Sequence, residues 1–546
     1  MTPHHTELLA RASMLERSGQ WDEACDCYDQ AYRLCLTDHD CDSLLETIVR
    51  IGHCHRQAGN SAAAAEVLEL SSDLGELSGD ASLSGRALNG LGILKHDQGD
   101  IDAAHALYLR AREHALRAGD SFTAGSSEQN LGILANIRGD LAGALNLYRA
   151  GLDNLEKAAH RQGCASVLNN LGMLHVDLGE LQAADEYFRR ALGICGEISD
   201  VVTAGIVHLN RTELFLARGE SELARASCDE AFETFSRVGQ EDGRAEAMKF
   251  YGLIYKAWGK PHLSAAFLRQ AIQIGSQHGF LLVEAESQRE LAFVLREQGQ
   301  NREGLQALNR AHHLFTHLQA SQDQADVHGR IQRLQEDFLS LVSAWGESIE
   351  AKDRYTRGHC QRVADYACRL AEEVGIGAPD IVWFRMGAFL HDVGKTEVPA
   401  EILNKPGALT DEERMVMERH TSIGEEILTP VEFPWDVRPM VRSHHERWDG
   451  RGYPDGLAEE AIPYPARILR IADIFDALTT ARSYRRPLSP EEAFGIMEED
   501  VGSFDPQVFA TFRKLFSELS GQARAAHVEA VGTGSANGAG NGNGTS

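Results

Sequence analysis

Glycine, small and large apolar positions recur along the first 320 residues at a constant spacing of 40. Glycines mark the frame at residues 19, 59, 99, 139, 179, 219, 259 and 299. Five positions after each glycine stands a small residue: Ala24, Ala64, Ala104, Ala144, Ala184, Ala224, Ser264 and Gly304. Four positions further on, the residue is mostly large and apolar: Tyr28, Leu68, Tyr108, Tyr148, Phe188, Cys228, Leu268 and Leu308. A period of this length predicts a solenoid of about eight helix pairs.

Each position of this frame has a physical role in a pair of helices. The glycine ends the first helix and turns the chain, and the small residue lets the second helix approach closely. The large residue then fills the groove between neighbouring pairs.

Two stretches show the frame most fully, NLGILANIRGDLAGALNLYRAGL (130–152) and NLGMLHVDLGELQAADEYFRRAL (170–192). Their Leu-Gly, Gly, Ala and aromatic positions are Leu131, Gly132, Gly139, Ala144 and Tyr148, then Leu171, Gly172, Gly179, Ala184 and Phe188. Residues 5–320 therefore resemble tetratricopeptide repeats, although the unit exceeds the usual 34 residues and lacks the helix-end proline. The resemblance implies a concave surface that binds a protein or peptide partner, or a second copy of the chain as a homodimer.

A heptad stripe of apolar residues follows the repeats, at Val327, Ile331, Leu334, Phe338, Leu341 and Trp345. Two interpretations stay open for residues 321–349: a helical linker that forms a dimeric coiled coil, or an amphipathic helix packed on its own domain. Gly346 is expected to interrupt the helix just past the stripe.

Beyond residue 350, histidines, aspartates and glycines gather in clusters between apolar helical stretches. These clusters are DRYTRGHCQRV (353–363), FLHDVGK (389–395), ERHTSIGEEIL (418–428), SHHERWDGRGYPDGL (443–457) and RILRIADIFDALTTARSYRR (467–486). Asp392 and Asp473 stand in apolar surroundings, where an unpaired carboxylate is costly to bury. A metal ion offsets such charge, and the clusters add five histidines as ligands: His359, His391, His420, His444 and His445.

Seven candidate ligands favour two metal ions over one. His391 and Asp392 are neighbours on an expected helix, about 100° apart, so both reach a centre between them. A ligand set rich in nitrogen suits iron or manganese better than magnesium. We therefore expect two divalent transition-metal ions, Fe or Mn, bridged by Asp392 and by a water or hydroxide.

HDVGK and HHERWDGRGYP match the two signature motifs of the HD-GYP domain, the bacterial branch of the HD phosphohydrolases, and residues 350–517 resemble that domain. The resemblance implies that one metal is held by His359, His391, Asp392 and Asp473, and the second by Asp392, His420, His444 and His445. It implies that Lys395 contacts the scissile phosphate and acts in catalysis with Asp392. The residues implied to shape the site or hold the phosphates or guanine of the substrate are Tyr453, Arg482 and Arg485. Some relatives bind a third metal through a glutamate where this chain has Tyr355, which argues against a third metal here.

The activity that the resemblance implies is hydrolysis of cyclic di-GMP by a metal-bridging hydroxide, giving linear pGpG and, in many members of the family, GMP. All the implied ligands and the Gly-Tyr-Pro of residues 452–454 are present, which favours catalysis. Two alternatives stay open: a non-catalytic scaffold that responds to nucleotide, and a phosphodiesterase for another cyclic dinucleotide such as cyclic GMP–AMP.

Composition narrows the function classes and the location. A net charge of −28 argues against a duplex-DNA binder. No apolar run suggests a membrane span or a signal peptide, and the ten cysteines form no CxxC pair, so we expect a cytoplasmic protein with reduced thiols. The expected chain is all-α, with a repeat solenoid over 1–320, a linker over 321–349, an all-helical HD-GYP domain over 350–520 and a disordered tail over 521–546.

Overall fold

The computed structural model describes residues 3–17, 20–38, 41–322, 325–352, 358–431, 433, 436–480, 486–500 and 502–516. Over these residues the predicted all-α fold is confirmed: the named elements are α-helices and two short 3-10 helices, and an isolated bridge joins Asp449 to Ala458. None of the described helices is long and apolar enough to cross a membrane. The predicted tail over 521–546 lies outside the described residues.

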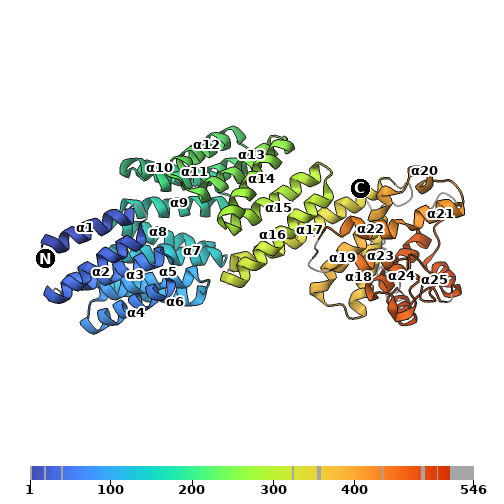
Figure 1. Cartoon of the computed structure of the whole chain (residues 1–546), viewed down its shortest axis with the longest axis horizontal. Helices are drawn as coiled ribbons and strands as arrows, with labels where there is room; N and C mark the ends of the chain where they lie inside the picture. Colours follow the sequence, from blue (N-terminus) through green and yellow to red (C-terminus); the bar gives the residue numbers. More distant parts are fainter. Residues whose placement is uncertain are drawn as a thin grey trace, which may run out of the picture. The chain divides into compact units, whose positions relative to one another are not determined.

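The repeats form successive helix pairs joined by short turns (Figure 1). The helices are α1 (Pro3–Arg17), α2 (Trp21–Asp38), α3 (Cys41–Gln57), α4 (Ser61–Ser78), α5 (Ala81–Asp97), α6 (Ile101–Ala118), α7 (Ser121–Ile137), α8 (Leu141–Lys157), α9 (Arg161–Asp177), α10 (Leu181–Ile198), α11 (Val201–Ala217), α12 (Ser221–Val238), α13 (Glu241–Ala257), α14 (Pro261–His278), α15 (Leu281–Glu297) and α16 (Asn301–Gln322).

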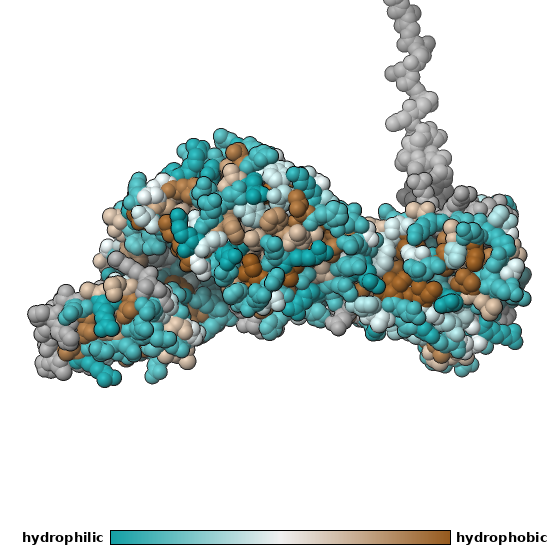
Figure 2. Space-filling model, turned by 45° about the horizontal axis from the view of Figure 1, so that its top comes forward, coloured by the Kyte–Doolittle hydropathy of each residue, from teal (hydrophilic) through white to brown (hydrophobic). Residues whose placement is uncertain are grey.

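The 40-residue frame has the predicted structural basis. From Gly59 to Gly299, each described glycine of the frame has a positive φ, such as +78° at Gly139, which a side chain would strain. The small and large residues of the frame are buried, whereas hydrophilic residues cover much of the visible surface (Figure 2). A Cβ at Gly132 would lie 2.6 Å from the Tyr148 ring, so that glycine makes room for the aromatic residue of its own repeat.

A buried charge network ties three helices together at the C-terminal end of the repeats. Lys249 of α13 lies 2.6 Å from a carboxylate oxygen of Glu246 and also bonds Glu286 of α15. Glu286 in turn pairs with Arg330 of α17 (Ala325–Glu350). The lysine is buried and both of its partners are largely shielded from water, so each charge depends on the others for compensation.

The remaining elements carry the candidate site. They are α17, α18 (His359–Glu373), α19 (Ala378–Leu390), η1 (Val393–Glu397), α20 (Ala400–Leu403), α21 (Asp411–Glu418), α22 (His420–Leu428), α23 (Arg438–Ser443), η2 (Glu459–Ala461), α24 (Tyr464–Thr479) and α25 (Pro490–Glu499), followed by a helical stretch over 506–516. Large buried side chains such as Phe338, Phe384, Phe475 and Phe512 form the core.

Helix α17 differs from the prediction in one respect. It continues through Gly346 to Glu350, so the expectation that Gly346 interrupts the helix is wrong. The glycine has a packing role instead, since a Cβ there would lie 3.1 Å from the backbone oxygen of Phe389 in α19. The stripe residues Leu334, Phe338, Leu341 and Trp345 are buried within this chain. Phe338 contacts Trp383 with ring centroids 5.6 Å apart, which favours an amphipathic helix packed on its own domain.

The chain divides into two compact units, one of residues 1–294 and 310–332, the other of residues 295–309 and 333–546. The predicted linker over 321–349 is divided between these units, because residues 321–332 group with the first and residues 333–349 with the second. The nine cysteines whose side chains the structure describes are buried, and none of these nine forms a disulfide bond.

Candidate metal centre

The His-Asp pair of FLHDVGK stands where a helix ends, not within a helix as predicted. Helix α19 stops at Leu390, His391 keeps helical dihedral angles, and Asp392 (φ −96°, ψ 10°) begins the tighter turn of η1. Gly394 then brings η1 against α22, since a Cβ there would lie 1.9 Å from the His420 backbone oxygen. This close approach holds Asp392 beside His420.

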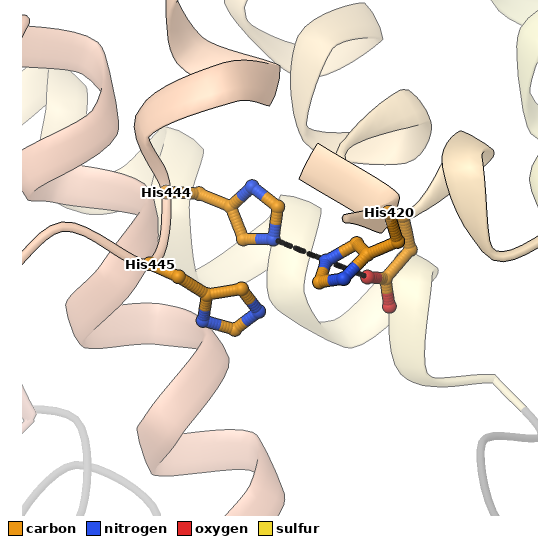
Figure 3. A group of neighbouring side chains, drawn as sticks. His420, His444 and His445 are labelled. Atoms are coloured by element: carbon orange, nitrogen blue, oxygen red, sulfur yellow. Dashed lines mark hydrogen bonds and ion pairs between the residues drawn. The ribbon is translucent and has the colours of Figure 1, made fainter. Parts of the chain in front are cut away.

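Asp392, His420, His444 and His445 form one group whose ligand atoms all lie within 4.8 Å of one another. His420 Nε2 is 3.4 Å from Asp392 Oδ1 and 3.4 Å from His444 Nε2, and His445 lies beside them (Figure 3). Four side chains from three separate segments thus converge on one buried point. Their number and type fit a transition-metal ion.

Three of the histidine rings are oriented by the same kind of hydrogen bond, from the ring to a backbone carbonyl oxygen. The Nδ1 atom of each lies 2.7 Å from the carbonyl oxygen three residues earlier: His391 to Ala388, His420 to Met417 and His444 to Val441. These carbonyls belong to the last turns of α19, α21 and α23, so each ring is held by the end of the helix that precedes it. Donation from Nδ1–H leaves the Nε2 lone pair of each ring for a metal.

His359, His391 and Asp392 form a second group within the same 4.8 Å limit, so Asp392 is common to both groups. Asp473 Oδ1 is 3.4 Å from His359 Nε2, which brings the seventh predicted ligand to this group. His391 Nε2 and Asp392 Oδ1 are buried polar atoms without a hydrogen-bond partner. Orphaned atoms of this kind, both facing the cluster, fit ligands of a metal ion.

The electrostatics give His420, His445 and Asp392 the charge states that metal ligands need. Burial lowers the pKa of His420 to about 4 and that of His445 to about 3, so both rings are neutral at pH 7. Burial opposes ionisation of Asp392, but Lys395 and His391 outweigh it and hold the pKa of Asp392 well below its usual range. The carboxylate is therefore an anion.

His359 has the opposite shift. Burial lowers its pKa, but the hydrogen bonds and charges of Asp473 and Asp476 outweigh burial and raise it to about 9. His359 Nδ1 lies 2.8 Å from Asp476 Oδ2, and Arg362 holds Asp476 through contacts of 2.6 and 3.0 Å. Asp476 thus lies behind the His359 ring, on the side away from the cluster, where it can orient that ring.

The two predicted substrate-facing side chains that the structure describes lie at the cluster. Lys395 Nζ is 2.6 Å from Asp392 Oδ2, and its side chain is partly exposed. The Tyr453 ring lies 4.8 Å from that of His445. Arg482, Arg485 and Tyr355 lie outside the described residues.

Sequence reasoning missed the role of Glu446, which directly follows the two histidines. This buried carboxylate accepts hydrogen bonds from the backbone N–H groups of Asp455, Gly456 and Leu457. It therefore fixes the loop that carries Tyr453 beside His445. The position of Glu446, between the two histidines and a glycine-rich loop, is the sequence feature that could have predicted this role.

Comparison with known proteins agrees with this geometry. Residues 344–508 match the HD domain family, and residues 6–76 and 122–197 match the tetratricopeptide repeat family, so both predicted resemblances are confirmed. The chain is 39% identical over 180 residues to 3'3'-cGAMP-specific phosphodiesterase 3 of Vibrio cholerae serotype O1, covering 33% of this chain and 39% of that protein. It is 40% identical over 189 residues to a cyclic di-GMP phosphodiesterase of Thermotoga maritima, covering 34% and 51%.

A third relative is the cyclic di-GMP phosphodiesterase response regulator RpfG of Xanthomonas campestris pv. campestris, 38% identical over 177 residues, which are 32% of this chain and 47% of that protein. In each case the match spans about half or less of the relative's length.

Proposed function

We propose that the chain is a metal-dependent phosphodiesterase that hydrolyses cyclic di-GMP to linear pGpG, to GMP, or to both. The observation that carries this proposal is the sharing of Asp392 by two groups of ligand atoms. The HD domain and the names of the relatives support the class of substrate. One ion would be held by His359, His391, Asp392 and Asp473, and the other by Asp392, His420, His444 and His445.

Two divalent transition-metal ions, iron or manganese, would supply the Lewis acidity that activates water and offsets charge on the phosphate. The chain's own residues would hold and orient the substrate. Lys395 lies one turn beyond the shared aspartate, and its partly exposed ammonium group is placed to bind a phosphate oxygen. Tyr453, anchored through Glu446, would form a wall against the nucleotide, and Arg482 and Arg485 would bind its phosphates or guanine.

A second candidate substrate is 3'3'-cyclic GMP–AMP, because a Vibrio cholerae relative of equal similarity is named for that activity. Purified full-length protein, loaded with Mn²⁺ or Fe²⁺, should be compared on the two dinucleotides by chromatography of the products. A higher kcat/KM for cyclic di-GMP is expected, and the reverse ranking would reassign the substrate. Bound metal without turnover of either would favour the non-catalytic scaffold.

The repeats would bind a protein or peptide, or a second copy of the chain, and bias the catalytic region through α17. We also propose that the protein acts in the cytoplasm. Because residues 295–309 group with the second unit, a truncation that tests this coupling should keep α15 and α16 whole. Deleting residues 1–280 is expected to change turnover or oligomeric state, and no change in either would exclude the coupling.

A further inference from the structure

The backbone on either side of His359 is held by a carboxylate from another helix. Glu350 Oε2 accepts a hydrogen bond of 2.6 Å from the N–H of Gly358, and Oε1 accepts one from the N–H of Cys360. Glu350 is the last residue of α17 and is only 8% exposed. His359, the first residue of α18, therefore stands between two N–H groups that share one buried carboxylate.

Helix α18 has no cap of its own. Gly358 occupies the N-cap position with a φ of +73° and has no side chain to accept the first N–H groups, and the first turn contains no acidic residue. The N-terminal end of a helix carries unpaired donors and a partial positive charge, and a carboxylate satisfies both. The Glu350 carboxylate of α17 therefore caps the N-terminal end of α18, whose own sequence provides no capping side chain.

The same end of α17 also touches the helix that leads to the next ligand. Gly346, one turn before Glu350, lies against the backbone oxygen of Phe389, two residues before His391. The last turn of α17 thus contacts the start of α18 and the end of α19, the two elements that present His359 and His391. The Glu350 side chain makes the hydrogen bonds from this turn to the start of α18.

We propose that Glu350 is a positioning residue for the metal centre: its two hydrogen bonds set where the His359 ring stands relative to Asp473 and Asp392. Both carboxylate oxygens accept backbone N–H groups, so Glu350 acts through His359 and is not itself a ligand. Asp476 fixes the ring of His359, and Glu350 fixes its backbone. This inference rests on the proposed function only in taking His359 as a ligand.

The expected effect is selective for one of the two ligand groups. Residues that orient a metal ligand typically change metal affinity by about 10–100-fold when they are replaced. Loss of the Glu350 bonds frees the backbone of His359, whereas His420 and His444 keep the carbonyl bonds that orient them. One metal affinity should therefore fall and the other should stay close to that of the wild type.

The test is a titration of Mn²⁺ into metal-free full-length protein, followed by calorimetry, with circular dichroism of the metal-free samples as the check on folding. Glu350→Gln keeps the shape of the side chain but loses the charge and one acceptor, and should weaken one of two binding steps about 10-fold. Glu350→Ala should weaken the same step further, towards about 100-fold. Glu347→Gln, exposed and one turn earlier on α17, is the matched control and should titrate as the wild type.

Two binding steps unchanged in Glu350→Gln, or both weakened equally, would overturn the inference and leave Glu350 a helix cap only. If Glu350→Ala does not fold, the titration of Glu350→Gln alone tests the proposal. The metal titration tests the role of Glu350 and the turnover assay tests the proposed function, so the two results are independent of each other. A wild-type protein that binds two ions but hydrolyses no dinucleotide would refute the proposed function while the role of Glu350 is still measured.

Discussion

Gly394→Ala tests whether the close approach of η1 to α22 builds the shared aspartate site. A Cβ at this position would lie 1.9 Å from the His420 backbone oxygen and 2.7 Å from the Gly424 nitrogen. Non-bonded heavy atoms rest about 3.5 Å apart, so the two segments must separate by roughly 1.5 Å. Asp392 Oδ1 and His420 Nε2 are 3.4 Å apart, and metal sites tolerate only about 0.2 Å of error in ligand distance.

We therefore expect the variant to lose tight binding of at least one ion and to lose about 100-fold in activity, with overpacking costing about 1–3 kcal/mol in stability. Elemental analysis of dialysed protein, thermal unfolding and turnover of cyclic di-GMP are the measurements. Gly495→Ala is the matched control, because no atom lies within 4 Å of its added Cβ, and it should keep wild-type metal content. A Gly394→Ala protein with two tightly bound ions and normal turnover would refute the packing argument.

Three further perturbations, the first with a control variant, have defined outcomes. Lys249→Ala leaves the charge of Glu286 with one partner fewer and should lower the free energy of unfolding of the repeats by about 3 kcal/mol in denaturant titrations. Arg117→Ala, which removes an exposed ion pair, should cost at most about 0.5 kcal/mol, and equal costs for the two variants would contradict the account of the network. Glu446→Ala frees the loop of Tyr453 and should raise KM for the dinucleotide at least 10-fold while metal content stays normal. An unchanged KM would refute the role of Glu446 in placing Tyr453 against the substrate. Chelation should lower the melting temperature of the second unit, and re-addition of Mn²⁺ should restore it, since an ion that binds only the folded state stabilises it; a melting curve indifferent to chelator would exclude a tightly bound ion.

The repeats were predictable because their determinants are local and recur in register. Gly139 needs its left-handed backbone and Gly132 its small size within a single repeat, so one repeat predicts the next. The candidate ligands were equally visible, because a carboxylate such as Asp392 in an apolar stretch calls for compensation.

Tertiary contacts explain what the sequence did not reveal. Gly346 looks like a helix breaker, but its place is set by the backbone of Phe389, which lies far away in the chain. Glu350 and Glu446 each satisfy N–H groups of a segment that begins eight or more residues later, and no periodic pattern marks such a partner. The end of α19 before His391 likewise depends on the packing of η1 on α22.

The central claim is that Asp392 joins two metal sites into one phosphodiesterase centre. Its most direct test measures metal content and cyclic di-GMP hydrolysis together, in wild-type protein and in Asp392→Ala. We expect about two ions per chain and metal-dependent release of pGpG or GMP by the wild type, with both lost in the variant while helix content is kept. Wild-type protein that holds two ions and releases no linear product, or an Asp392→Ala variant that still turns over, would contradict the account.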